Sequence, residues 1–505
     1  MDSGPLFAND RTMITGPTLR RRAFLAGGLA AAATLPILPR RGLAAAAARE
    51  PVVLHAAPAV QTLAGGDYPK TDIWAFNGTA PGPVLRYRQG DRLLAVLRNG
   101  LDQGTTIHFH GIRMPVAMDG VPGLTQDAVP TGGGFGYDFA LPDAGTFWYH
   151  PHANSAEQVG RGLYGALVVE EREPPAVDRD LLWVLDDWRL DAEARIPPFG
   201  HRHDEAHQGR LGNTVTVNGD PEPMLRLRAG ERVRLRLVNA ANARVFGLTF
   251  EGHAPVVVAL DGQPCTPHEP ANGRLDIGPA QRADVILDAA GDPAARFRII
   301  DGYYAQQRYR LADILYDDAA PLRTNPLDAP VALPANPLPP PDLDGASRQE
   351  VVLAGGAMFG MNMDRNTSQG GHGMHKQTMP AMGTDIDLEA MVKRGRFWAI
   401  NGVDAGHDSM PVPMMRVALG RTVVLGMHNH TEWDHPMHLH GHSFRVLSHN
   451  GHPLAREEWR DTVLLAPHDT AEVAFVADNP GTWMFHCHIL EHQMTGMTAL
   501  IDIIA

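Results

Sequence analysis

Apolar and polar residues alternate in three related stretches of the chain, and such alternation is typical of β-strands. The first stretch reads NGTAPGPVLRYRQGDRLLAVLRN from Asn77, and the second reads NGDPEPMLRLRAGERVRLRLVN from Asn218. A longer third version runs from Asn401 to Asn429. The pattern predicts an all-β protein that contains three copies of one unit.

The spacing of histidines supports this repeat. In the first copy, His108 and His110 lie nine and eleven residues after the closing Asn99. The residues at the same offsets in the other two copies are His438 and His440 after Asn429, and Leu248 and Phe250 after Asn239. A second register agrees, because GTFWYHPH, ending at His152, aligns without gaps on GTWMFHCH, ending at His488. The first and third copies therefore carry histidine pairs that the middle copy has lost.

Four His-x-His pairs result from these two registers. Residues i and i+2 of a strand project from the same face, so each pair can direct two imidazoles toward neighbouring metal ions. We expect eight imidazoles from two domains to hold a metal cluster between those domains. The pairs are His108/His110, His150/His152, His438/His440 and His486/His488.

A second site is predicted by the residue inside the last of these pairs. On a strand, Cys487 points away from the face that its two flanking histidines share. Together with His492 and Met497 it offers the sulfur and imidazole donors of a blue-copper electron-transfer site. Pro151 occupies the matching position in the first copy, so only the third domain can hold such a mononuclear site.

The chain has only two cysteines, Cys265 and Cys487. In an oxidising compartment such a pair would ordinarily form one disulfide. A structural zinc site typically uses two or more cysteines, which argues against zinc at Cys487. Copper at Cys487 leaves Cys265 without an intramolecular partner, and we expect it to be a buried free thiol in the second domain.

The N-terminal 48 residues resemble a twin-arginine export signal. Its core is RR-x-F-L, formed by Arg21, Arg22, Phe24 and Leu25, and a short apolar run with small-residue cleavage sites follows. The alternative, a membrane anchor, needs roughly 20 apolar residues, and this run is shorter. We expect a mature chain that works in a bacterial periplasm and has no membrane span.

Composition and charge narrow the class further. The formal charge is 44 − 57 = −13, so no basic face is implied and nucleic acid is an unlikely partner. The 52 glycines and 41 prolines fit a turn-rich β-protein. The expected domains are residues 50–172, 173–320 and 346–505, with a proline-rich linker at 321–345. The third domain would contain a methionine-rich insertion at 358–382.

The motifs HFHG, HPH, HPMHLHGH and HCHILEHQMTGM together resemble the multicopper oxidases, a family that includes laccases and bacterial cuprous oxidases. The resemblance covers essentially the whole mature chain and implies three cupredoxin-like Greek-key β-domains with four copper ions. It implies a type 1 copper at His435, Cys487, His492 and the axial Met497. It implies a type 2 copper at His108 and His438, and a type 3 pair at His110, His150, His152, His440, His486 and His488.

By the same resemblance, the protein oxidises a substrate one electron at a time and reduces O2 to water. The protons for that reduction need an acid, and Asp119, eleven residues after His108, lies where such enzymes place one. Its alternative role is as the Asp of an Asp-Gly turn. Some cuprous oxidases have a second acid directly after the histidine that corresponds to His492, whereas this chain has Gln493. Glu491 or a chain of water molecules would then have to substitute.

The sequence indicates the copper ligands more clearly than it indicates the reductant. Thioethers suit Cu(I), and the insertion contributes six of them: Met358, Met361, Met363, Met374, Met379 and Met382. The alternative is an adaptable loop whose methionines fill gaps. Glu432 and Asp434 could orient a reductant near His435. The segment HRHDEAH, from His201 to His207, could collect Cu(II) or could be a solvated loop.

Three functions are compatible with these features. We expect a monomeric cuprous oxidase that protects the periplasm from Cu(I). The first alternative is a laccase-like oxidase of phenols or other aromatic reductants. The second is a non-enzymatic envelope protein of the same fold, which predicts lost ligands, whereas all ten ligand histidines, Cys487 and Met497 are present.

Overall fold

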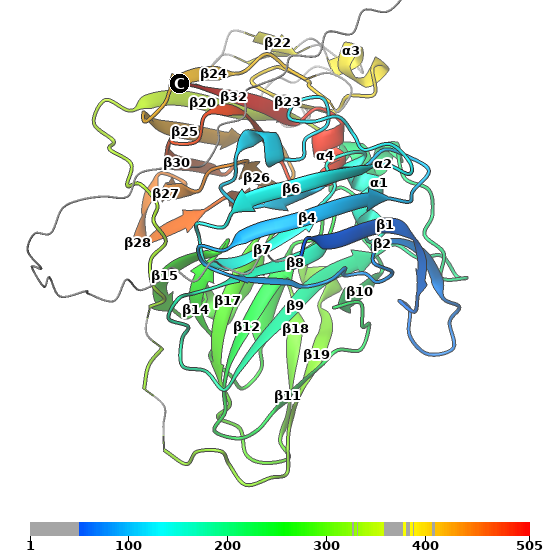
Figure 1. Ribbon diagram of the computed structural model, residues 1–505, viewed down its shortest axis with the longest axis vertical. Coiled ribbons are helices and arrows are strands. Elements are labelled where there is room, and N and C mark those ends of the chain that lie inside the picture. The colour runs from blue at the N-terminus through cyan, green and yellow to red at the C-terminus, as the bar shows by residue number, and fades with distance from the viewer. Residues whose placement is uncertain are drawn as a thin grey trace, which may run out of the picture. The chain divides into compact units, whose positions relative to one another are not determined.

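Residues 50–325, 328–330, 332–357, 377–379, 384–386, 388–406 and 410–505 are described by the computed structural model, and most of their regular structure is β-strand (Figure 1). The strands form three successive pairs of sheets, which we call the first, second and third domains. The segment expected to be an export signal lies outside the described residues, as does nearly all of the methionine-rich insertion.

The first domain pairs a sheet of order β2-β1-β4-β6 with one of order β3-β8-β7-β5. Its strands are β1 Val52–Gln61, β2 Thr71–Phe76, β3 Leu85–Arg88, β4 Arg92–Asn99, β5 His108–His110, β6 Gly134–Ala140, β7 Gly145–His150 and β8 Gly165–Glu170. Its helical turns are η1 Val116–Met118 and α1 Ser155–Gly160.

The second domain pairs the sheets β10-β9-β12-β17-β14-β15 and β11-β19-β18-β13-β16. Its strands are β9 Arg179–Trp188, β10 Thr214–Val217, β11 Met224–Leu227, β12 Arg232–Asn239, β13 Phe246–Phe250, β14 Val256–Leu260, β15 Gln263–His268, β16 Leu275–Ile277, β17 Arg282–Asp288, β18 Arg296–Asp301 and β19 Tyr309–Tyr316. Its short helices are α2 Arg202–Ala206, η2 Ala271–Gly273 and η3 Ala305–Gln307.

The third domain pairs the sheets β23-β20-β25-β30-β27-β28 and β24-β32-β31-β26-β29. Its strands are β20 Ser347–Gly355, β23 Trp398–Ile400, β24 Met415–Ala418, β25 Thr422–Asn429, β26 His435–Leu439, β27 Phe444–His449, β28 His452–Arg460, β29 Thr462–Leu465, β30 Thr470–Val476, β31 Gly481–Cys487 and β32 Thr498–Ile504. Its helices are α3 Leu388–Lys393 and α4 Leu490–Met494, and β21 Gln377–Met379 pairs with β22 Thr384–Ile386 in a separate ribbon.

The three domains share one strand pattern. The first strand of each lies parallel to the strand that ends its repeat, as β1 does to β4, β9 to β12 and β20 to β25. The opposite sheets also correspond, since β8, β19 and β32 each run parallel to one neighbour and antiparallel to the other. The prediction of an all-β protein with three copies of one unit is confirmed.

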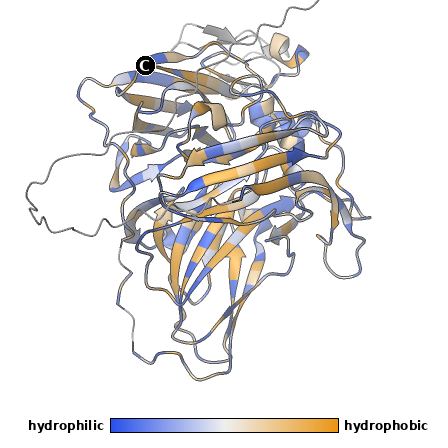
Figure 2. Ribbon diagram, in the orientation of Figure 1, coloured by the Kyte–Doolittle hydropathy of each residue, from blue (hydrophilic) through white to orange (hydrophobic). Residues whose placement is uncertain are grey.

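Apolar and polar residues alternate along the strands, and the apolar ones form the hydrophobic core of each domain. In β4, Leu93, Ala95 and Leu97 are buried, while Arg92 and Arg98 are exposed. Figure 2 shows the same mixture of apolar and polar positions along strands of all three domains. Strands β7, β26 and most of β31 are buried on both faces, because one face packs in a domain core and the other carries the histidine pairs.

The asparagine that closes each repeat has a structural reason. The buried Asn99 Nδ2 donates to the carbonyl of Val129 (2.8 Å), and its Oδ1 accepts from the N–H of Leu101 (2.9 Å). Asn239 and Asn429 likewise donate to carbonyls and accept from the N–H two residues further on. A short side chain with both a donor and an acceptor satisfies buried backbone groups at the strand end.

The short helices meet next to the third-domain sheets. Helix α4 directly follows β31 and packs against α1 of the first domain and α2 of the second (Figure 1). Among the described residues, no helix has the length and apolar character needed to cross a membrane.

Candidate metal centres

The His-x-His pairs lie on neighbouring strands of two domains. Strand β5 pairs with β7 so that His108 lies opposite His150, and β26 pairs with β31 so that His438 lies opposite His486. All eight pair histidines are at most 6% exposed. Stacked rings join the two domains, with centroids 4.0 Å apart for His108 and His440 and 3.7 Å apart for His110 and His438. The expected convergence of the pairs is therefore present.

Hydrogen bonds at the outer edge of this cluster determine which ring nitrogens face inward. His108 Nδ1 donates to the carbonyl of Asp119, and His438 Nδ1 donates to the carbonyl of Asp461, both at 2.8 Å. Because a carbonyl only accepts, Nε2 of each ring carries a lone pair. Neither Nε2 has a hydrogen-bond partner among the described residues. Buried polar atoms in native proteins rarely lack a partner, so these two nitrogens fit metal coordination.

Two other imidazoles face each other with lone pairs. His440 Nδ1 donates to the carboxylate of Asp119 (2.9 Å), and His486 Nδ1 donates to the carbonyl of Cys487 (2.8 Å). Their Nε2 atoms are consequently both acceptors, yet they lie 3.1 Å apart. A cation between or beside them removes that repulsion. Further inward nitrogens without a partner among the described residues are His110 Nδ1 and His152 Nε2, and His488 Nε2 lies 3.4 Å from His150 Nε2.

The protonation state also suits metal binding. Burial and then the charge of neighbouring His438 lower the pKa of His486 to about 3. Burial, followed by neighbouring histidines, also holds the pKa well below its ordinary value in His150, His152, His440 and His488. These imidazoles are neutral at physiological pH and so offer lone pairs to a metal.

A second group of possible metal ligands lies on the face of β31 opposite to the histidine pairs. Cys487 Sγ is 3.5 Å from His435 Nδ1 and 3.8 Å from His492 Nδ1, and the two nitrogens are 3.2 Å apart. All three side chains are fully buried. Burial raises the pKa of the Cys487 thiol. A thiolate here therefore needs a compensating cation.

The outer nitrogens of this second group are also fixed. His435 Nε2 donates to Thr431 Oγ1 (2.8 Å), whose own hydroxyl donates to Asn429 Oδ1 (2.8 Å). His492 Nε2 donates to the main-chain carbonyl of His207 (2.6 Å), which belongs to the second domain. Both Nδ1 atoms consequently point lone pairs toward Cys487 Sγ, which fits a metal held by all three.

Met497 lies in the same core. It is fully buried, its carbonyl accepts from the N–H of Cys487 (3.1 Å), and its side chain belongs to the apolar cluster around the thiol. Gly496 before it has a φ of +134°, and a Cβ at that position would overlap the carbonyl of Trp398. The glycine thus permits the close approach of this turn to Trp398, whose ring packs against His492 with centroids 4.0 Å apart and an interplanar angle of 35°.

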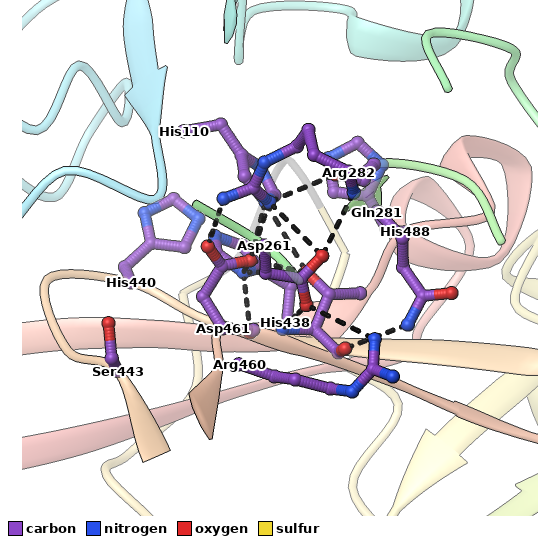
Figure 3. A network of polar contacts seen from close by, with 12 residues as sticks. His110, Asp261, Gln281, Arg282, His438, His440, Ser443, Arg460, Asp461 and His488 are labelled. Carbon is purple, nitrogen blue, oxygen red and sulfur yellow. Dashed lines mark hydrogen bonds and ion pairs between the residues drawn. The ribbon is translucent and has the colours of Figure 1, made fainter. Parts of the chain in front are cut away.

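A buried ionic network, which no motif or spacing in the sequence indicates, supports the cluster (Figure 3). Asp461 Oδ1 accepts from His110 Nε2 (3.0 Å) and from Arg282 Nη1 (2.9 Å). Arg282 starts β17 of the second domain, and its Nε also donates to the carbonyl of Thr146 in the first domain (3.2 Å). Although burial raises the pKa of Asp461, the charge and hydrogen bonds of Arg282 hold it well below its usual range. Burial and the charge of Asp461 raise the pKa of nearby Asp261 to about 6.

Asp119 and Asp461 play reciprocal roles. The carbonyl of each accepts from the first histidine of a pair in its own domain, and the carboxylate of each accepts from the second histidine of a pair in the other domain. The two aspartates lie at different distances from their histidine pairs, eleven residues after His108 and 23 after His438. The offset of Asp119 from His108 therefore does not locate Asp461. The internal repeat indicates only that the third domain should contain an acid that corresponds to Asp119.

The second predicted acid lies elsewhere. Glu491 is buried on α4, and its carboxylate accepts from Asn242 Nδ2 (3.0 Å) and from the N–H of Arg210 (3.1 Å), both in the second domain. Burial raises its pKa. The side chain next to the cluster is instead Gln493, whose Nε2 lies 3.2 Å from His152 Nδ1 and whose Oε1 accepts from Ser155 Oγ (2.8 Å). His152, Ser155 and Gln493 all line one cavity of about 190 Å³.

The predicted substrate residues are placed only in part. Burial raises the pKa of Asp434 to about 6, and its carboxylate is hydrogen-bonded to Tyr303 of the second domain. Glu432 Oε1 lies 3.4 Å from His468 Nε2. Of the insertion's methionines, Met379 falls in β21 without a described side chain, and the following lie outside the described residues: Met358, Met361, Met363, Met374 and Met382. Cys265 is a buried free thiol, as predicted.

Comparisons with known proteins assign the family. Models described as multicopper oxidase match residues 60–174, 180–313 and 377–503. Multicopper oxidase MmcO of Mycobacterium tuberculosis is 30% identical over 96% of this chain and 96% of its own length. The chain belongs to the multicopper oxidase family, and it is an oxidoreductase that uses O2 and binds copper.

Other relatives have different names. Laccase-1 of Botryotinia fuckeliana is 28% identical, over 84% of this chain and 77% of that protein. Copper resistance protein A of Escherichia coli is 26% identical, over 84% of this chain and 88% of that protein. Among solved structures, the multi-copper oxidase from Pseudomonas Thermotolerans has a TM-score of 0.76 and 35% identity, covering 90% of this chain and 99% of that one.

The Asp461→Asn substitution tests the buried network. It removes the charge that pairs with Arg282 and the carboxylate that orients His110, so we expect roughly 10- to 100-fold weaker copper binding. Copper retained per chain after dialysis against graded chelator concentrations measures this. Glu457→Gln, on the exposed face of β28, is the matched control and should retain the wild-type copper content. Equal retention in Asp461→Asn would contradict the supporting role.

The copper-free chain should lose stability in acid. Imidazole in the unfolded chain titrates near 6.5, whereas the pKa is about 3 in folded His486 and His492. Between these values the unfolded chain binds more protons, so the free energy of unfolding falls as pH falls from about 6.5 toward 3, by up to about 1.4 kcal/mol per pH unit for each histidine. Denaturant titrations at several pH values measure this slope. His492→Gln should reduce it and exposed His452→Gln should not; a flat profile would refute the expectation.

Proposed function

We propose that His435, Cys487, His492 and Met497 hold a type 1 copper. We further propose that His108 and His438 hold a type 2 copper, and that the type 3 pair is held by His110, His150, His152, His440, His486 and His488. The observation that carries this proposal is the set of inward nitrogens without partners, together with the Cys487 thiol between two inward Nδ1 atoms. We also propose that the three domains comprise residues 50–172, 173–320 and 346–505.

Bound copper supplies one-electron chemistry, which lets single electrons from a reductant be collected for the four-electron, four-proton reduction of O2 to two waters. The chain's own contribution is the geometry between the two centres. Because β31 turns Cys487 to one side and His486 and His488 to the other, a single peptide segment joins the centres covalently. The His486 Nδ1 bond to the Cys487 carbonyl (2.8 Å) adds a second link.

Asp119 is the acid that we propose for proton delivery. It is fully buried, and its Oδ2 accepts from His440 Nδ1 (2.9 Å), so this carboxylate lies directly beside the cluster that the protons must reach. Glu491 was the second candidate, and its contacts with Asn242 and Arg210 favour a role in holding α4 against the second domain.

We propose Cu(I) as the physiological reductant and copper tolerance as the role, with export by the twin-arginine pathway to the periplasm as a monomer. Similarity to a copper resistance protein and the methionine-rich composition of residues 358–382 support Cu(I). Similarity to a laccase supports the alternative, a phenolic reductant. Glu432 and Asp434 remain proposed contacts for the reductant, because both lie within three residues of His435 along the chain.

The Cys487→Ser substitution tests the type 1 assignment. We expect loss of the intense visible absorption, loss of one copper per chain and loss of oxygen uptake with every reductant, because the thiolate is the soft ligand of this site. Cys265→Ser removes the other buried thiol and should keep all three properties. Retained colour in Cys487→Ser would rule out a copper thiolate at that residue.

Oxygen uptake with two reductants tests the substrate. The copper-loaded full chain and a variant that lacks residues 358–382 are compared with Cu(I) and with dimethoxyphenol. We expect the deletion to lower the Cu(I) rate at least ten-fold while phenol oxidation persists. If phenol oxidation is strong and the Cu(I) rate survives deletion, the laccase-like alternative replaces the cuprous oxidase.

A further inference from the structure

The second domain carries no predicted copper ligand, yet its helix α2 is fixed against the proposed type 1 centre. Three consecutive carbonyls at the end of α2 accept hydrogen bonds from the third domain. The donors are Trp398 Nε1 to Glu205 (2.6 Å), the Ala357 N–H to Ala206 (2.8 Å) and His492 Nε2 to His207 (2.6 Å). The last carbonyls of a helix lack intrahelical partners, so these donors hold α2 in one position.

Other contacts strengthen this position. Asp204 is 5% exposed and accepts from Arg189 Nη1 (2.6 Å), which ties α2 to the end of β9. The ring of His207 packs edge-on against Trp433, with centroids 5.3 Å apart. Trp433 is two residues from His435, so α2 lies next to both histidines of the proposed type 1 centre.

His203 of α2 and His207, the residue that follows α2, form a histidine pair. His203 and His207 are four residues apart and stack nearly parallel, with an interplanar angle of 9° and centroids 4.2 Å apart. His207 Nδ1 donates to the carbonyl of His203 (2.9 Å), which leaves the lone pair on Nε2. Within the described part of the chain, no hydrogen bond uses Nε2 of either ring. The His203 side chain is 81% exposed and can rotate, so the two rings can share one ion.

We propose that His203 and His207 form a docking site for a metal-ion reductant, specifically Cu(I), and that His207 is the entry point for its electron. The proposal rests on the proposed function above. The docked Cu(I) loses one electron and leaves as Cu(II), and the electron passes through His207 and its carbonyl to His492. Four such events, with four protons, match the reduction of one O2 to two waters.

The proposed electron route from the docked ion to His492 is short, because it runs through a single residue, His207. The His207 imidazole contacts the ion, and the main-chain carbonyl of the same residue accepts the hydrogen bond from His492 Nε2 (2.6 Å). No solvent gap has to be crossed between the ion's ligand and a ligand of the proposed type 1 copper. A phenol, which needs no imidazole ligand, gains nothing from this pair, so the site discriminates between the two classes of reductant.

The test uses the copper-loaded full chain and three variants: His203→Ala, His207→Ala and the double variant. The His207→Ala variant keeps the main-chain carbonyl, so the visible absorption of the type 1 centre should remain. The matched control is His201→Ala, an exposed histidine of the same segment. Two measurements are made: oxygen-uptake kinetics with Cu(I) and with dimethoxyphenol, and binding of one additional Cu(II) followed by equilibrium dialysis and electron paramagnetic resonance.

We expect at least a ten-fold rise in KM for Cu(I) in the double variant, unchanged phenol kinetics and loss of the additional Cu(II) site. His201→Ala should behave as wild type. Equal Cu(I) kinetics and equal Cu(II) binding in wild type and double variant would overturn the docking site alone. Oxygen uptake with dimethoxyphenol but none with Cu(I) in the wild type would overturn the proposed substrate, and the entry route with it.

Discussion

Both centres depend on one constraint: eight of the ten imidazoles donate from an outer nitrogen to a fixed acceptor and keep the inner nitrogen as a lone-pair donor. The acceptors include the carbonyls of Asp119 and Asp461 around the cluster, and Thr431 Oγ1 and the His207 carbonyl around Cys487. Each such bond selects one tautomer and one ring orientation. Neutral, oriented lone pairs buried without partners are costly in the copper-free chain, and metal binding offsets that cost.

The acceptors come from all three domains, so the centres are properties of the assembled chain. Asp119 and Asp461 bind histidines across the interface between the first and third domains. The second domain has no ligand histidine, but Arg282 holds Asp461 in its charged form and also contacts Thr146 of the first domain. Removing the partner of a buried charge is costly, so the middle domain supports the cluster through Arg282.

The sequence revealed those features that repeat or alternate. The histidine pairs stood at matching offsets in two copies of one unit, and the period of a strand separated Cys487 from its neighbours. Asp461 and Arg282 could not be found in this way, because they are single residues whose partners lie 351 and 179 positions away along the chain. The carbonyl of His207 leaves no trace in the sequence, since any residue has a carbonyl. Glu491 is adjacent to His492 in the sequence, but its carboxylate accepts a hydrogen bond from Asn242, and adjacency in the sequence does not show this direction.

The central claim is that the inward atoms of the two groups hold copper on opposite faces of β31. Diffraction from crystals of the copper-loaded protein, with anomalous differences collected on both sides of the copper absorption edge, tests it most directly. We expect one copper peak bounded by Cys487 Sγ and the Nδ1 atoms of His435 and His492, and three more among the eight pair histidines. Absence of a copper peak beside Cys487, or a disulfide joining Cys487 to Cys265, would contradict it.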